Sequence, residues 1–372
     1  MFCTRMKLKE RKDISMKQDN LKTNENRKIW HYSDLVSPFN QSKILVHADK
    51  LIELSTKKIV APICCEIDLV DGFCNNKCKH CFFGTNEKFS PVLMDTTRAK
   101  QLIDELNHLG VKGIELSGGG EPTTHPNIKE IVTYAYKLGM DIGIVTNGCL
   151  LEQLEECYHM FTFIRVSIDA ATPETYKKVH GVDCFHKVVE NLKRVVKSGN
   201  GDKLGVGYLI TGTNNCDIIP AAQFFKEIGC RFLQYRPASL KESFPDIIWQ
   251  ESKHLVEEAV KYADNTFQIF DAGIKWEHIF AERQYTKCTT SCLVAVVKAN
   301  GDVPICVLKR NDEAMCLGNI YENTFKDIYF SKRHEEIIDN NDLSKCRKPC
   351  KHDSYNIIHE ALCKDYLHRN FV

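Results

Sequence analysis

The stretch Cys74-Asn75-Asn76-Lys77-Cys78-Lys79-His80-Cys81 holds three cysteines spaced C-x3-C-x2-C. It follows an apolar run over residues 63–70 that predicts a short buried strand. The cysteines therefore lie on the loop that leaves the carboxyl end of this strand, where α/β folds bind ligands. Three thiolates suit either a zinc ion or an iron–sulfur cluster. In a cluster they leave one iron without a protein ligand, open to a small molecule.

The overall charge of the chain is balanced. Its 372 residues include 50 basic and 49 acidic side chains, a formal net charge of +1, which gives no reason to bind nucleic acid or an anionic membrane. No apolar run approaches the ~18 residues that span a bilayer, and the N-terminus lacks a secretory signal. We expect a cytoplasmic protein without nucleic-acid or membrane partners. Eighteen cysteines in that compartment indicate metal or redox chemistry rather than disulfides.

Predicted strands and helices alternate between residues 63 and 240. The strands are expected at 63–70, 113–117, 141–146, 163–168, 204–210 and 231–236, and the helices at 96–109, 126–138, 151–159, 174–198 and 218–228. This rhythm predicts a parallel sheet with right-handed crossovers. The expected fold class is α/β, a partial (β/α)6 TIM-like barrel followed by a small cysteine-rich C-terminal domain.

Four segments surround the predicted barrel at 63–240. Residues 1–28 are polar and highly charged and predict a disordered arm. Residues 29–62 carry scattered apolar groups and predict a lead-in that packs on the core. Residues 241–285 predict a helical linker, and residues 286–372 form the cysteine-rich domain.

The predicted strands end in residues that suit a binding site. Gly118-Gly119-Gly120-Glu121 follows the second strand. There the glycines let a backbone approach a ligand and the carboxylate accepts hydrogen bonds, although a plain turn would also use glycine. Thr146-Asn147-Gly148 follows the third strand, and Asn-Gly by itself predicts a turn.

The fourth and sixth strands carry charged residues. Alternation places Arg165, Ser167 and Asp169 on one face of the fourth strand, toward the barrel interior. Asp169 has a structural alternative, because either Asp169 or Thr172 would cap the next helix. Arg236 ends the sixth strand, where its guanidinium suits a carboxylate or phosphate, with a surface salt bridge as the alternative.

A second group of cysteines lies near the C-terminus. Asn300-Gly301-Asp302 predicts a hairpin turn between a strand at 293–297 and a returning strand at 303–306. That hairpin would bring Cys288 or Cys292, which precede it, close to Cys306, which ends it. The pair Cys346 and Cys350 follows later. Taken alone, the group also suits a structural zinc site. Its members are Cys288, Cys292, Cys306, Cys346 and Cys350.

The cysteine motif, the Gly-Gly-Glu-Pro run and the α/β repeat together resemble the radical S-adenosylmethionine (SAM) superfamily. The resemblance implies that Cys74, Cys78 and Cys81 hold a [4Fe–4S] cluster whose open iron is chelated by SAM. It further implies a 5′-deoxyadenosyl radical that abstracts hydrogen from a substrate, and a reducing partner such as flavodoxin or ferredoxin.

The resemblance also implies which residues bind SAM. In the family, a Gly-Gly-Glu-Pro run holds the SAM amine, and the third strand ends in a Thr-Asn-Gly-like turn. Polar residues of the fourth strand bind the ribose hydroxyls and the carboxylate, and the fifth strand lies against the adenine. The implied residues are Gly119, Gly120, Glu121, Asn147, Ser167 and Asp169, with Arg236 toward SAM or substrate.

The hairpin, Gly318-Asn319-Ile320 and the late cysteine pair resemble the SPASM and twitch domains of this superfamily, which bind auxiliary [4Fe–4S] clusters. The dense cysteine run of a full SPASM domain is reduced here to one pair, so we expect one auxiliary [4Fe–4S] cluster. If only three cysteines bind, its open iron would be free to hold substrate. The implied ligands are Cys288, Cys306, Cys346 and Cys350, with Cys292 replacing Cys288 as an alternative, and Cys316, Cys363 and His352 as weaker candidates.

The substrate is not encoded in these motifs. Peptide-modifying members often carry an N-terminal recognition domain, and the lead-in here is shorter. We therefore expect a small biosynthetic intermediate, such as a sugar or nucleoside, that is oxidised or forms a new bond. The alternative is a maturase that modifies a ribosomally made peptide or a protein side chain. A non-catalytic metal-binding scaffold and a plain electron carrier are more distant alternatives.

Overall fold

The computed structural model describes residues 41–81, 91–238, 246–271, 282–283, 285–346, 348, 350–368 and 370–371. The chain divides into two compact units, Met1–Val46 and His47–Val372. In the first unit the described residues begin a 3-10 helix, η1 (Gln41–His47). The arm expected at 1–28 lies outside the described residues, as does the lead-in up to residue 40. All candidate site residues belong to the second unit.

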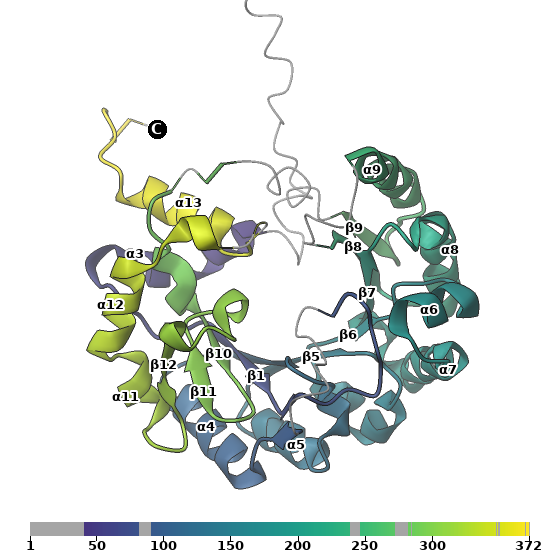
Figure 1. The fold of residues 1–372 in the computed structure, drawn as a ribbon, viewed down its shortest axis with the longest axis horizontal. Helices are drawn as coiled ribbons and strands as arrows, with labels where there is room; N and C mark the ends of the chain where they lie inside the picture. Colours follow the sequence, from purple (N-terminus) through teal and green to yellow (C-terminus); the bar gives the residue numbers. More distant parts are fainter. Residues whose placement is uncertain are drawn as a thin grey trace, which may run out of the picture. The chain divides into compact units, whose positions relative to one another are not determined.

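A sheet of eight parallel strands forms the centre of the described part of the large unit, in the order β10-β1-β4-β5-β6-β7-β8-β9 (Figure 1). Six of its strands fall on the predicted segments and make a partial (β/α)6 barrel: β1, β4, β5, β6, β7 and β8. The strands are β1 (Cys64–Asp68), β4 (Gly113–Ser117), β5 (Asp141–Thr146), β6 (Phe163–Ser167), β7 (Leu204–Ile210), β8 (Phe232–Pro237), β9 (Gln268–Asp271) and β10 (Val294–Val297).

The helices that connect the strands follow one another around the outside of the sheet (Figure 1). None in the described ranges has the length and apolar character needed to cross a membrane. The helices are α3 (Ala48–Thr56), α4 (Thr96–His108), α5 (Ile128–Lys137), η3 (Leu151–Met160), α6 (Pro173–His180), α7 (Phe185–Val195), α8 (Ile218–Ile228), α9 (Asp246–Val260), α11 (Phe325–Tyr329), α12 (Lys332–Asn340) and α13 (Asp353–Cys363).

The helix predicted over residues 174–198 is two helices, α6 and α7. Gly181 ends α6 in the left-handed conformation, with φ of 69°, which glycine adopts without a steric penalty. At the start of α6 the Thr172 hydroxyl accepts a hydrogen bond from the Thr175 amide, at 3.3 Å. Thr172 is therefore the cap of this helix, and Asp169 is left for another role.

The two faces of the sheet differ in chemistry. One face is apolar and lies under the helices, as the fully buried Ile114, Ile164 and Tyr235 illustrate. The other face, toward the barrel interior, carries charged side chains. Glu66 and Glu115, for example, are neighbours in the β1–β4 register. Alternation along β6 and β8 puts Arg165, Ser167, Gln234 and Arg236 on this inner face.

The predicted hairpin after residue 292 forms only in part. Its turn is present, with the Lys298 amide donating to the Asp302 carbonyl at 2.9 Å. The strands on either side pair elsewhere, however. β10 joins the edge of the main sheet parallel to β1, and β11 (Asp302–Pro304) pairs antiparallel with β12 (Cys316–Asn319). The C-terminal segment thus extends the barrel sheet next to the strand that leads to the cysteine motif.

The segment 241–285, expected to be helical, also contains a strand. α9 accounts for its described helical part, and β9 then pairs in parallel with β8 at the opposite edge of the sheet from β10. β9 is four residues long, too short for an alternation pattern to separate it from a turn.

Two ion pairs, one of them fully buried, attach the C-terminal segment to β1. Arg310 pairs with Asp68, and their side chains are 3% and 1% exposed. Lys351 pairs with Glu66 on the inner face of the same strand. Burial raises the pKa of Asp68 to about 7, and the Arg310 guanidinium opposes that rise. Asp68 therefore depends on its arginine to remain charged inside the protein.

Arg310→Met should lower the free energy of unfolding by about 3 kcal/mol, because it leaves a buried carboxyl without its partner. The folded variant would then hold a proton on Asp68 at pH values where the unfolded chain has released it, so the loss should grow between pH 6 and pH 8. Urea unfolding at the two pH values measures this. Arg194→Met is the control, since its pair with Glu155 is about half exposed and its loss should change stability little. Equal losses in both variants would contradict the expectation.

Candidate functional site

The first cysteine loop begins just after β2 (Val70–Asp71) and folds its three thiols together. Burial raises the pKa of Cys74 to about 11, and the nearby Glu121 and Cys81 add to the rise. Burial also raises the pKa of Cys78, with Asp169, Cys74 and Cys81 contributing. Cys74 and Cys78 therefore need a nearby cation to form thiolates, and together with Cys81 they make a donor set that fits an iron–sulfur cluster.

Polar groups surround the sulfur atoms of this loop. The Asn76 amide donates to Cys74 Sγ at 3.4 Å, and Asn147 Nδ2 lies 3.6 Å from the same sulfur. The same Asn147 Nδ2 also donates to Asn75 Oδ1 at 2.5 Å. Hydrogen bonds to cluster sulfurs are one of the means by which proteins set a cluster's reduction potential. Asn147 therefore reaches the cysteine loop directly.

His180, at the end of α6, also contacts this loop and was not anticipated from the sequence. Its Nδ1 lies 3.1 Å from Cys78 Sγ, and its Nε2 lies 2.8 Å from the Ile168 carbonyl. Because a carbonyl only accepts, Nε2 carries the proton in the neutral ring. The His180 carbonyl accepts from the Lys77 amide at 2.8 Å, and a Cβ on Gly181 would come within 2.6 Å of the Lys77 carbonyl. The end of α6 thus packs directly on the cysteine loop.

The glycine loop after β4 packs against the residues that enter the cysteine loop. A Cβ on Gly118 would overlap Asp68, one on Gly119 would overlap Asp71, and one on Gly120 would overlap the Phe73 carbonyl. The Glu121 amide donates to that same carbonyl at 3.0 Å. These contacts between protein atoms are enough to require glycine at all three positions.

Glu121 links the glycine loop to the loop after β5. Its Oε1 accepts from the amide and hydroxyl of Thr123 and from the hydroxyl of Thr146, and its Oε2 accepts from the Asn147 amide at 2.8 Å. Burial raises the pKa of this carboxyl, and these hydrogen bonds oppose the rise. Oε2 has a single donor and retains capacity for another.

Asp169, just after β6, connects β6 to β7 at the carboxyl end of the sheet. It adopts a left-handed backbone, with φ of 51°, a strain that non-glycine residues adopt only when their surroundings enforce it. Its carboxylate accepts from the Leu209 amide at 2.6 Å and lies 3.4 Å from His180 Nε2. Ser167 lies two residues earlier and pairs in register with Gly207.

Two arginines meet on the inner face of the barrel. A Cβ on Gly207 would approach Arg236 Nη2 at 3.1 Å and Arg165 Cδ at 3.6 Å, so both side chains lie against this glycine. Each has a buried Nε that makes no hydrogen bond to the described residues. Burial and the charge of Arg165 lower the pKa of Arg236 to about 10, which leaves it protonated. This pair has donors to offer to a carboxylate or phosphate. Gly205, near the start of β7, is covered by the Phe232 ring.

Four members of the second cysteine group line one small cavity. Its wall includes Cys288, Cys306, Cys346 and Cys350, the four ligands expected from the sequence. Asn356 Nδ2 donates to Cys288 Sγ at 3.4 Å. Burial raises the pKa of Cys306 to about 11 and that of Cys350 to about 12, and the other thiols contribute. Four half-buried cysteines around one cavity fit a fully cysteine-ligated cluster.

The alternative ligands lie outside this cavity wall. Cys292 is fully buried, and its thiol donates to the Thr289 carbonyl at 3.4 Å. The Cys316 thiol donates to the Gly318 carbonyl at 3.4 Å, and the exposed Cys363 lies 3.6 Å from His359. His352, a weaker candidate from the sequence, does line the cavity. Within the described ranges no three His, Cys, Asp or Glu side chains are placed to share a single metal ion.

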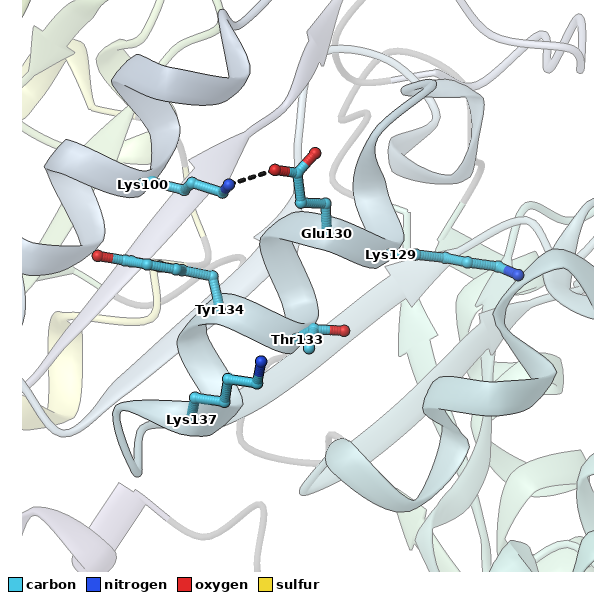
Figure 2. A pocket seen from close by; sticks show the side chains of 6 residues that line it. All are labelled: Lys100, Lys129, Glu130, Thr133, Tyr134 and Lys137. Carbon is cyan, nitrogen blue, oxygen red and sulfur yellow. Dashed lines mark hydrogen bonds and ion pairs between the residues drawn. The ribbon is translucent and has the colours of Figure 1, made fainter.

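An open groove on the outer surface lies between α4 and α5 (Figure 2). Lys100 pairs with Glu130 across the groove, and Lys100 also lies 5.5 Å from the centre of the Tyr134 ring. These side chains are on the helix faces directed away from the sheet. The groove is therefore not part of the candidate site. The residues that line it are Lys100, Lys129, Glu130, Thr133, Tyr134 and Lys137.

Comparison with known proteins identifies the class of this protein. Residues 70–225 match the family model described as the Radical SAM superfamily, and residues 288–352 match SPASM, described as an iron–sulfur cluster-binding domain. The chain belongs to the radical SAM superfamily. It is an enzyme with a C-terminal SPASM domain, and its cofactors are SAM, the [4Fe–4S] cluster that binds SAM and an auxiliary [4Fe–4S] cluster.

Individual relatives differ in what their names describe. Mycofactocin maturase MftC of Mycobacterium tuberculosis is 24% identical over 296 residues, 75% of this chain and 73% of the relative. A probable GTP 3′,8-cyclase of Thermococcus kodakarensis is 25% identical over 257 residues, 64% and 83% of the two chains. Streptococcus suis SuiB, solved bound to precursor peptide SuiA, superposes with a TM-score of 0.61 at 17% identity, over 88% of this chain and 78% of SuiB. SuiB has also been solved with SAM.

In iron-free protein the candidate ligands Cys74 and Cys350 should react slowly with iodoacetamide. At pH 8 a thiol of pKa about 11 is ionised in about one molecule per thousand, and the thiolate is the reactive form. Exposed Cys216 and Cys363 should be alkylated at least about tenfold faster than Cys74 and Cys350. Peptide mass spectrometry over a time course measures the rates. Cys230, buried away from both groups and with a pKa raised to about 12, is the slow control. Equal rates at Cys74 and Cys216 would contradict the expectation.

Proposed function

We propose that this radical SAM enzyme is a maturase that modifies a ribosomally made peptide or a protein side chain. The expectation of a small biosynthetic intermediate rested on the short lead-in, and the comparisons do not confirm it. The main support for a peptide is the similarity to SuiB, which was solved with a precursor peptide and matches over 88% of this chain. MftC, named a maturase, matches over 75%. Similarity to the cyclase over 64% keeps a nucleotide as the second candidate.

The proposed SAM site lies where the loops after β1, β4, β5 and β6 meet. Cys74, Cys78 and Cys81 would hold the cluster, which with SAM supplies a 5′-deoxyadenosyl radical for hydrogen abstraction. Glu121 would accept the SAM amine at Oε2, where one protein donor already lies. Gly119 and Gly120 would form the adjoining backbone wall. A reducing partner such as flavodoxin or ferredoxin would supply the electron.

The remaining residues would position SAM and the substrate. Asn147, whose amide already bonds the cysteine loop, would fix that loop beside the amine. Ser167 and Asp169 would face the ribose and carboxylate from the end of β6. Arg236 and Arg165, each with a buried Nε to satisfy, would bind a carboxylate of SAM or of the peptide.

The proposed domain organisation follows from these roles. Residues 63–240 form the catalytic barrel, and residues 286–372 form the auxiliary-cluster domain. Cys288, Cys306, Cys346 and Cys350 would be its ligands, since all four line one cavity. Lys351 extends from this domain to Glu66 on the inner face of β1, so the auxiliary cluster would lie near the barrel interior where substrate binds. An electron acceptor there favours a two-electron outcome.

Variants of the two cysteine groups should differ in which cluster they lose and in whether they still cleave SAM. Anaerobically reconstituted enzyme should hold about eight irons and form 5′-deoxyadenosine with SAM and dithionite. The triple variant Cys74→Ala/Cys78→Ala/Cys81→Ala should keep about four irons and lose SAM cleavage. Cys346→Ala/Cys350→Ala should lose the other cluster and still cleave SAM. Zinc in place of iron, or cleavage by the triple variant, would contradict the assignment.

Peptide and nucleotide substrates are told apart by turnover. Short peptides encoded beside the gene and GTP are offered separately, with 5′-deoxyadenosine and product mass as readouts. A peptide that loses two hydrogens in step with 5′-deoxyadenosine formation supports the maturase. Conversion of GTP with unchanged peptides would replace it by the nucleotide function.

Glu121→Ala should weaken SAM binding about tenfold or more, because a charge-assisted hydrogen bond contributes about 1.5–3 kcal/mol. Iron content should be unchanged, since Glu121 is not a cluster ligand. Equilibrium binding of SAM to the reconstituted enzyme gives the affinity. Glu130→Ala, which changes an exposed glutamate of the outer groove, is the matched control. Normal affinity in Glu121→Ala would show that the amine binds elsewhere.

A further inference from the structure

His352 is a buried histidine in the wall of the four-cysteine cavity. It is 2% exposed and follows Cys350 by two positions. Its backbone amide donates to Cys350 Sγ at 3.4 Å, and the Tyr355 ring meets the imidazole edge-on at 6.0 Å between centres. The side chain thus shares the cavity with the cysteines and is shielded from water.

Neither ring nitrogen of His352 has a hydrogen-bond partner within the described residues. The Thr290 backbone lies close to the ring, but neither ring nitrogen meets it in hydrogen-bonding geometry. An imidazole ring carries at least one N–H in either protonation state. A buried donor without a partner is unfavourable, so whatever fills this cavity is expected to accept it.

Other polar side chains around the cavity already have partners. Arg283 donates to Asp353 at 3.2 Å and to the Leu343 carbonyl at 2.7 Å, and Tyr285 donates to Asp353 at 2.5 Å. Asn341 Oδ1 is unpartnered too, but an amide oxygen only accepts and offers nothing to a sulfide. His352 therefore places a buried ring N–H in the described wall that these contacts leave for the group in the cavity.

We propose that His352 donates its ring N–H to the auxiliary [4Fe–4S] cluster and raises its reduction potential. A hydrogen bond to a cluster sulfur withdraws electron density and stabilises the more negative, reduced form. The inference rests on the proposed function, in which the four cysteines hold that cluster. His352 is a positioning and tuning residue here and need not contact the substrate.

His334 supplies a matched control in the same C-terminal segment. Its side chain is fully buried, and burial lowers the pKa of His334 to about 4, so its ring is neutral. Its Nδ1 donates to the Tyr329 carbonyl at 2.7 Å. His334 is not part of the cavity wall, so replacing it tests the effect of losing a buried histidine without touching the cluster.

The experiment measures the auxiliary cluster alone, in the full chain carrying Cys74→Ala/Cys78→Ala/Cys81→Ala. In this background, His352→Phe, His352→Gln and His334→Phe are reconstituted anaerobically and checked for folding by circular dichroism. Redox titration followed by electron paramagnetic resonance gives the midpoint potential. His352→Phe should move it to more negative values and change the spectrum. His352→Gln, which keeps an N–H donor, and His334→Phe should match the background protein.

The possible results separate this inference from the proposed function. A background protein without iron contradicts the ligand assignment and removes the inference with it. A normal cluster whose potential is unchanged by His352→Phe, or shifted equally by Phe and Gln, overturns the inference alone. If His352→Phe folds but loses its iron while His352→Gln keeps it, the N–H donor is required to retain the cluster, which supports the inference.

Discussion

The close contact between the glycine loop after β4 and the start of the cysteine loop is the constraint on which the site depends. Because positions 118–120 lack side chains, this loop lies directly on Asp68, Asp71 and the backbone of Phe73. Glu121 is thereby held where its carboxylate joins the loop after β5, and Asn147 in that loop bonds the region of Cys74. Three strand ends and the first cysteine are thus connected by one series of contacts between protein atoms.

The C-terminal segment is built onto the same strand. β10 pairs with β1, and the buried Arg310 neutralises Asp68 on that strand. Arg310 also lies close to Gly119, since a Cβ there would come within 2.9 Å of its Nη2. The segment that carries the second cysteine group therefore supports the glycine loop as well. Removing that segment would be expected to disturb both cysteine groups together.

Local patterns predicted most of the barrel and the first cysteine loop. The motif formed by Cys74, Cys78 and Cys81 is a local pattern that spans only eight residues. The six central strands are separated by clear helical segments. Contacts between distant residues were not predictable. His180 meets Cys78 across 102 positions, and no spacing rule links them. The choice of Cys288 over Cys292 for the cavity wall depends on how η7 (Thr289–Leu293) turns, which the C-x3-C spacing leaves open. The break at Gly181 was missed because a single glycine is tolerated within a helical pattern.

Gly181 shows how far the cysteine motif extends beyond its own sequence. Its missing side chain lets the end of α6 press against Lys77, one of the three residues between the first two cysteines. A larger residue there would push on the motif as well as strain the left-handed end of α6. In a comparison of natural variants, position 181 should therefore vary together with the motif's spacer residues, although about a hundred residues separate them. A mutational scan should therefore group position 181 with the three cysteines of the motif.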